Sequence, residues 1–191
     1  MHPETKSLSV SNMALIGLMT AVICILGPLS IPIPLSPVPI SFTNLAIFLT
    51  VCLLGWKAGT ISYLLYLAIG LAGLPVFSGF SSGFGRLLGP TGGYLIGMIF
   101  TAILSGLSFE KLKNPFLIGS GLILGTGISY ITGTIWLCLQ AHLTFIQGLW
   151  AGVIPYIPGD LIKITAAVII GPLIKKRLLA SGLLVSRLNH N

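Results

Sequence analysis

Charged residues are scarce in this chain, and their scarcity argues against a soluble globular domain. Only 7% of the 191 residues are charged, against about a quarter in soluble domains. Hydrophobic residues make up 54%, and the mean hydropathy is +1.03. Too little polar surface remains to cover a globule in water, whereas the apolar length suffices for several membrane spans of about 20 residues. The composition therefore predicts a single membrane-embedded domain over residues 1–191.

Acidic side chains are the rarest charged groups, with three in the whole chain. The sole aspartate is Asp160, and the two glutamates are Glu4 and Glu110. The ten Lys and Arg residues produce a formal net charge of +7, but most lie in short connectors beside apolar segments. That placement is typical of membrane topology signals and argues against a nucleic-acid partner.

Catalytic and metal-binding motifs are also missing. The chain has no H-E-x-x-H helix, no G-x-S-x-G elbow and no phosphate-binding loop. Cys24, Cys52 and Cys138 lie inside apolar runs without metal-ligand spacing, which predicts hydrophobic packing. We therefore expect no enzymatic activity, no cofactor and no metal, and any ATP-driven step needs a separate ATPase.

Six apolar segments predict an all-α membrane protein with six transmembrane helices. Long continuous apolar runs are typical of such helices, whereas a membrane β-barrel shows alternating segments of about 10 residues. The connectors after the first, third and fifth segments are rich in proline or glycine, and the last has room for a short helix. The predicted segments are 12–28, 42–55, 57–73, 92–108, 116–139 and 160–174.

The basic residues predict the orientation of these helices. Eight of the ten fall on one side of a six-helix topology: Lys6, Lys57, Lys111, Lys113, Lys175, Lys176, Arg177 and Arg187. The positive-inside rule makes that side cytoplasmic and places both termini there. The three long connectors, with Arg86 and Lys163, then lie toward the outside.

Asp160 and Lys163 lie three residues apart at the start of the sixth segment. From Asp160 to Lys175 a helix rises about 22 Å, against a hydrocarbon core of about 30 Å. Asp160 should therefore lie below the outer edge of the core, with Lys163 deeper still. Non-helical backbone at such depth is tolerated only where protein buries it or where it lines a cavity. We expect the external connectors to fold inward over a cavity.

Three interpretations account for this charged pair. Asp160 directly precedes an apolar helix, as an N-capping residue does. Asp160 and Lys163 also share a helix face, which favours a purely structural ion pair. In the third interpretation, the pair faces the cavity and offers one acceptor and one donor to a polar ligand.

Other external residues have two interpretations each. Arg86 is either a solvated loop residue or a cation that attracts an anionic ligand. Tyr94, Trp150 and Tyr156 are either interfacial aromatics or walls of an apolar ligand site. The lone external histidine, His142, receives no role.

Three stretches stand out as motifs: PVPISF (37–42), GRLLGPTGGYLIG (85–97) and PYIPGDLIK (155–163). Together they resemble the BioY family, the biotin-specific S components of energy-coupling factor (ECF) transporters, and the resemblance covers essentially the whole chain in order. One departure is SFTN (41–44), where the family pattern leads us to expect a glutamine near the start of the second helix.

The resemblance implies a six-helix protein of the prokaryotic cell membrane that binds biotin from outside with high affinity. It also implies two kinds of partner, a membrane coupling (T) component and two cytoplasmic ATPases. The P-G-D-x-x-K motif falls on Asp160 and Lys163, and the G-P-T-G-G-Y motif includes Gly89, Thr91 and Tyr94. The expected substrate-binding residues are these five together with Thr43, Asn44, Arg86 and Tyr156.

Biotin, with a urea at one end and a carboxylate on a flexible tail, suits such a site. Asp160 and Lys163 match the urea, with Arg86 or loop N–H groups for the tail, while Lys163 on the carboxylate is the main alternative. Two other functional classes stay open. One is a stand-alone proton-coupled transporter of a small vitamin-like solute that uses Asp160, and the other is a membrane scaffold without a ligand.

Two further surfaces carry predictions. Ala14, Gly17 and Ala21 form a stripe of small residues on the first helix, and the family's small-xxx-small motif implies that this stripe contacts the partner, with packing inside the monomer as the alternative. The glycine-rich stretch 77–90 is predicted to be a lid or wall of the cavity.

Overall fold

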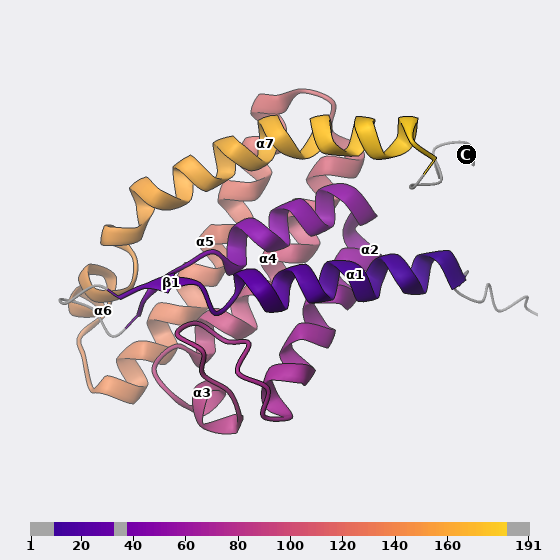
Figure 1. The fold of residues 1–191 in the computed structure, drawn as a ribbon. Coiled ribbons are helices and arrows are strands. Elements are labelled where there is room, and N and C mark those ends of the chain that lie inside the picture. The colour runs from indigo at the N-terminus through magenta and orange to yellow at the C-terminus, as the bar shows by residue number, and fades with distance from the viewer. Residues whose placement is uncertain (1–9, 33–37, 183–191) are drawn as a thin grey trace, which may run out of the picture.

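The computed structural model describes residues 10–32 and 38–182 as an assembly of helices with one small hairpin (Figure 1). The elements in order are α1 (Val10–Leu26), β1 (Ser30–Ile31), β2 (Ile40–Ser41), α2 (Thr43–Leu71), α3 (Phe84–Leu88), α4 (Gly92–Lys111), α5 (Pro115–Ala141), α6 (Phe145–Gly152), a 3-10 turn (Ile154–Tyr156) and α7 (Ile157–Ala180). The predicted helical membrane fold is confirmed, and α6 is the short helix expected before the prolines.

Four helical stretches in this part of the chain are long and apolar enough to cross a membrane. They are Thr43–Leu71, Gly92–Lys111, Pro115–Ala141 and Phe145–Ala180, and the shorter apolar helix Val10–Leu26 accompanies them. The predicted sixth segment, 160–174, was too short at both ends, because α7 begins at Ile157 and ends at Ala180. Its N-cap position is Tyr156, so the N-cap interpretation of Asp160 is wrong.

A backbone break at Gly55 divides α2 into two helical segments that correspond to the predicted segments 42–55 and 57–73. Gly55 has a φ of 81° and a ψ of 174°, which no helical residue adopts. The N–H of Trp56 donates to Oε1 of Glu110 at 2.9 Å, so the end of α4 caps the second segment. A carboxylate at a helix N-terminus is favourable because it complements both the free N–H groups and the helix dipole.

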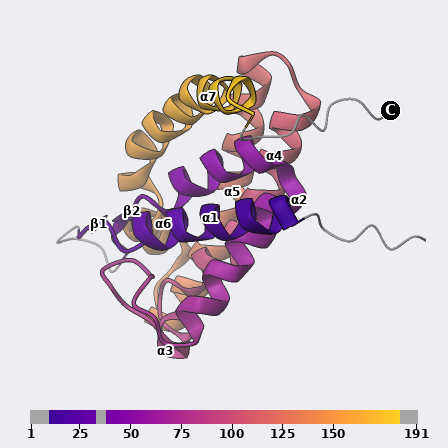
Figure 2. The same cartoon turned by 45° about the vertical axis from the view of Figure 1, so that its right-hand side comes forward.

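The helices pack through small residues and buried tyrosines. α4 and α5 approach closely, since a Cβ on Gly97 would lie 2.7 Å from the Cα of Ser129. The fully buried Tyr63 of α2 donates from its hydroxyl to the carbonyl of Leu95 in α4 at 2.7 Å. These contacts hold α2, α4 and α5 as the frame on which the remaining elements rest (Figure 2).

The Pro- and Gly-rich connectors fold over one end of this frame. The first connector forms the antiparallel pair β1–β2, with Ser30 opposite Ser41, a local departure from the all-α prediction. Proline removes backbone donors and disfavours helix, so a short hairpin is the available regular structure. The connector after the third predicted segment touches this first connector, because the N–H of Gly79 donates to the carbonyl of Pro28 at 3.0 Å.

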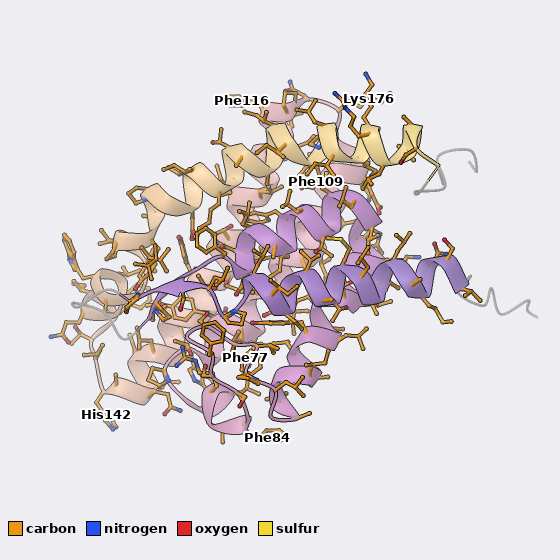
Figure 3. All side chains as sticks on the ribbon, viewed as in Figure 1. Phe77, Phe84, Phe109, Phe116, His142 and Lys176 are labelled. Atoms are coloured by element: carbon orange, nitrogen blue, oxygen red, sulfur yellow. The ribbon has the colours of Figure 1, made fainter. Side chains whose placement is uncertain are left out.

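The bases predicted to be cytoplasmic gather at one end of the molecule. Figure 3 shows Lys176 and Phe116 at one end, and His142 and Phe84 at the opposite end, where α3 and the α5–α6 connection lie. The predicted cytoplasmic bases at the ends of α4 and α7 belong to the first end. Lys6 and Arg187, which were part of the same prediction, lie outside the described residues.

Candidate functional site

A cavity lies between the connectors and the helix ends at the pole opposite Lys176. Its lining comes from six parts of the chain: Val38, Pro39 and Ser41 before α2, Thr43 and Asn44 in α2, Ser78 and Arg86 around α3, Thr91, Tyr94, Leu95 and Met98 at the start of α4, Tyr130 in α5, and Gly152, Tyr156, Asp160 and Lys163 around α7. The three Pro- or Gly-rich connectors therefore fold inward and line a cavity, as the sequence predicted.

Asp160 and Lys163 form an ion pair inside this cavity. Oδ1 of Asp160 lies 3.0 Å from Nζ of Lys163, and each residue is 8% exposed. The i, i+3 spacing places both on one face of the first turns of α7. Burial makes unpaired charges costly, so the pair has to be held by further hydrogen bonds.

Those hydrogen bonds come from α2 and α5. The Nδ2 amide of Asn44 donates to Oδ1 of Asp160 at 2.8 Å, and the hydroxyl of Tyr130 donates to Oδ2 at 2.5 Å. Nζ of Lys163 donates to the carbonyl of Ser41 at 2.6 Å and to Oδ1 of Asn44 at 3.2 Å. The pair is thus the centre of a network that joins the start of α2, the middle of α5 and the start of α7.

Arg86 contributes a separate positive pole. It lies in α3 and is half-buried, and its Nη2 donates weakly to the carbonyl of Ser78 at 3.5 Å. Burial lowers the pKa of the Arg86 guanidinium from its usual value, which means that its charge is partly desolvated. Within residues 10–32 and 38–182 the only ion pair within 4.0 Å is that of Asp160 and Lys163, so Arg86 faces the cavity without a carboxylate partner.

The aromatic residues wall the cavity and fix its connectors. The hydroxyl of Tyr94 donates to the carbonyl of Gly152 at 3.0 Å, and that of Tyr156 donates to the carbonyl of Val38. Both tyrosines are buried, which favours their interpretation as cavity walls. Trp150 is 64% exposed on α6 and does not line the cavity, as expected for an interfacial aromatic.

Eight of the nine predicted substrate-binding residues line this one cavity. The exception is Gly89, whose carbonyl accepts from Nε1 of Trp136 at 2.9 Å and so anchors the loop to α5. Thr91 is 8% exposed, and its hydroxyl has no hydrogen-bond partner in the described part of the chain. Sequence reasoning missed Ser41 and Tyr130, because a backbone carbonyl and an isolated tyrosine in an apolar helix carry no local signal.

The predicted partner stripe on α1 is at the surface. Ala14, Gly17 and Ala21 are all exposed, and a Cβ on Gly17 would meet no atom within 4 Å. Packing within the monomer therefore does not use this face of α1.

An apolar helical frame, with a buried charged network and a separate guanidinium around one cavity, defines a membrane-embedded solute-binding protein. Comparison with known sequences gives the particular family. The sequence profile of the BioY family matches residues 2–180, and the chain belongs to this family. The resemblance in the sequence motifs is thereby confirmed.

Relatives and a solved structure agree with this assignment. The chain is 39% identical over 183 residues to the biotin transporter BioY of Lactococcus lactis subsp. cremoris, covering 91% of this chain and 95% of the relative. It is 38% identical to the biotin transporter BioY of Thermotoga maritima, covering 84% and 93%. It also resembles the crystal structure of the S-component for biotin from an ECF-type ABC transporter, with a TM-score of 0.81, 38% identity and coverage of 92% and 95%.

Proposed function

We propose that this protein binds biotin from the external side of a prokaryotic cell membrane as the substrate-specificity subunit of an ECF-type transporter. The observation that carries the proposal is a cavity lined by two separate polar groups, the Asp160–Lys163 network and the Arg86 guanidinium. Tyr94, Leu95 and Met98 supply apolar wall, which suits a ligand that is apolar between two polar ends. The family membership and the biotin transporters among the relatives support the same ligand.

The urea of biotin fits the Asp160 pole. Lys163 has three N–H donors, and these already reach Ser41, Asn44 and Asp160. Asp160 carries negative charge there and would repel a second carboxylate. A urea, by contrast, brings two N–H donors and one carbonyl acceptor, which suit a carboxylate oxygen and an amide N–H.

The carboxylate of biotin then binds at Arg86. A guanidinium that is partly desolvated and has no carboxylate partner in the described residues gains most from an anionic ligand. The unpartnered hydroxyl of Thr91, which lines the same cavity, is a second donor for that carboxylate or for the neighbouring atoms.

Calorimetric titration of the purified protein with biotin in detergent tests this function. We expect saturable binding with one biotin per chain. Arg86→Gln should weaken biotin by about ten-fold or more, because one charged hydrogen bond is lost. Biotin methyl ester lacks the anionic tail, so it should bind parent and Arg86→Gln alike. No binding of biotin to the parent protein would overturn the proposal.

The remaining features of the proposal concern the assembly. Both termini lie on the cytoplasmic side, and the two segments of α2 count as separate spans in a six-span topology over residues 1–191. The exposed stripe of Ala14, Gly17 and Ala21 faces a membrane coupling component, which in turn binds two cytoplasmic ATPases. Small side chains let a partner helix approach closely, and this favours the stripe over the bulkier faces of the molecule.

A further inference from the structure

Tyr130 belongs to none of the sequence motifs, yet it touches the centre of the cavity. It projects from the middle of α5, lines the cavity and is half-buried. Its hydroxyl donates to Oδ2 of Asp160 at 2.5 Å, across 30 residues of sequence. The distance is typical of a strong hydrogen bond between a hydroxyl and a carboxylate.

The two carboxylate oxygens of Asp160 have different surroundings. Oδ1 accepts from both Asn44 and Lys163, at 2.8 and 3.0 Å. Oδ2 accepts from Tyr130. Since a carboxylate oxygen has about two acceptor positions, Oδ1 is saturated by the protein, whereas Oδ2 keeps one position for another donor.

The Tyr130 oxygen can also still accept a hydrogen bond, although it has no donor left to offer. A phenol has a single O–H donor, and Tyr130 uses it on Asp160. The same oxygen still has lone pairs, so it can only accept from a ligand. Tyr130 and Oδ2 of Asp160 therefore present two adjacent acceptors at the cavity.

We propose that Tyr130 is a further ligand-binding residue, which pairs with Asp160 to select a neutral ring carrying N–H donors. This inference rests on the proposed function, since the ring is the urea of biotin. The phenol accepts from one urea N–H, and its hydrogen bond to Oδ2 reduces the attraction of that oxygen for a cationic ring. Tyr130 thus sets both affinity for the urea and discrimination against a positively charged analogue.

The competing explanation is that Tyr130 only ties α5 to α7. Both explanations expect that Tyr130→Phe lowers stability. They differ for iminobiotin, in which a ring guanidinium, positively charged at neutral pH, replaces the urea. If the phenol contacts the ligand, removal of its hydroxyl lowers the affinity for biotin but leaves Oδ2 of Asp160 free to accept from the cationic ring of iminobiotin. A lost structural tie would weaken both ligands equally.

The test measures Kd for biotin and iminobiotin at neutral pH on the parent, Tyr130→Phe and Tyr63→Phe. Tyr130→Phe should weaken biotin by about ten-fold. The ratio of the iminobiotin Kd to the biotin Kd should fall by about three-fold or more. Tyr63→Phe is the matched control, because it also removes a buried tyrosine hydrogen bond, to the backbone carbonyl of Leu95, whereas Tyr63 itself does not line the cavity. It should lower thermal stability and leave both affinities unchanged.

The outcomes separate this inference from the proposed function. Failure of the parent to bind biotin overturns the proposed function. A parent that binds biotin, with Tyr130→Phe unchanged or equally weakened for both ligands, overturns the role of Tyr130 alone. If Tyr130→Phe does not fold, fluorotyrosine at position 130 replaces it. The oxygen of fluorotyrosine is a poorer hydrogen-bond acceptor, so the affinity for biotin should fall by about three-fold. Unchanged biotin affinity overturns the inference.

Discussion

At the scale of residues, the Asp160–Lys163 ion pair and its hydrogen bonds show how a chain with so few charges accommodates two buried ones. Each charge lies where water is largely excluded, and each has partners from other helices. Burying an unpaired charge is costly, so the pair and its network are needed for the charges to be present at all. Oδ2 of Asp160 retains the position from which the pair can recognise a ligand.

Replacing Asp160 tests that assignment. Asp160→Asn keeps the shape and one acceptor oxygen but removes the charge, so biotin affinity should fall. The loss of one charged hydrogen bond amounts to about 1.5–3 kcal/mol, or roughly ten- to 150-fold in Kd by calorimetry. The combination with Lys163→Met should be less than additive, because the two residues act as one unit.

A purely structural pair gives the opposite result for these variants. Thermal stability would fall for Asp160→Asn and Lys163→Met, while the folded fraction would bind biotin as tightly as the parent. Thermal melts and titrations on the same preparations separate the two cases.

At the scale of elements, the first helix is distinguished by what it leaves uncovered. Gly17 lies on an exposed face of α1 with no atom near its missing Cβ, so a larger side chain there has room in the isolated protein. The same side chain would prevent a close helix–helix approach to a partner.

We therefore expect Gly17→Leu to abolish co-purification with the coupling component while biotin binding stays within about two-fold of the parent. Ala21→Leu should behave in the same way. Gly127→Leu is the matched control, because Gly127 also has open space around its Cβ but lies on α5. Normal co-purification of both α1 variants would place the partner interface elsewhere.

The glycine-rich stretch 77–90 is an element whose conformation depends on a few positions. Of the four glycines in this stretch, Gly79 and Gly83 adopt left-handed backbone, with φ of 72° and 82°. Ser78 and Arg86 line the cavity from this stretch, so its position and the cavity wall are linked.

Biotin should slow amide hydrogen exchange across residues 77–90, because ligand contacts at Arg86 hold the stretch against the cavity. Mass spectrometry with and without biotin measures the change, with α5 residues 115–125 as the internal reference. Equal exchange rates in the two states would show that this stretch is a connector and not a lid.

The break in α2 is a second element with a testable physical cause. At Gly55 a side chain would require left-handed φ and would also collide with Oε1 of Glu110. Gly55→Ala should therefore lower the free energy of unfolding by about 1–2 kcal/mol or more, from backbone strain alone.

Thermal unfolding in detergent measures this loss. Gly119→Ala is the control, because Gly119 is a regular helical residue with open space, where alanine favours the helix. A Gly55→Ala variant as stable as the parent would mean that the break is not specified by this residue.

At the scale of the whole molecule, two features lie at opposite ends. The bases that end α4 and α7 lie at one end, and the cavity with its Pro- and Gly-rich connectors lies at the other (Figures 1 and 3). A cavity at one pole lets the protein capture a solute, whereas moving that solute across the membrane needs a source of energy.

The source of that energy distinguishes the two transport mechanisms. In liposomes containing only this protein, we expect no accumulation of biotin under a proton gradient. With the coupling component and both ATPases, ATP should drive uptake, measured with radiolabelled biotin. Accumulation by the protein alone, abolished by a protonophore, would instead support a proton-coupled transporter using Asp160.

The sequence by itself determined the class of protein, most of the helical segments and the charged pair of the candidate site, Asp160 and Lys163. Membrane segments are predictable because the transfer of apolar side chains into lipid depends on continuous runs along the chain. Asp160 and Lys163 were predictable because a charge beside an apolar run is costly wherever the chain folds. The motif containing Thr91 and Tyr94 added residues that the structure places around the same cavity.

The tertiary structure alone decided which side chains complete the network. Tyr130 reaches Asp160 across 30 residues, and the carbonyl of Ser41 reaches Lys163 across 122. Glu110 caps the second segment of α2 across 54 residues, and Gly89 serves the loop rather than the cavity. Hydrogen bonds of this kind depend on the distances and directions that helix packing creates, and neither periodicity nor hydropathy carries that information.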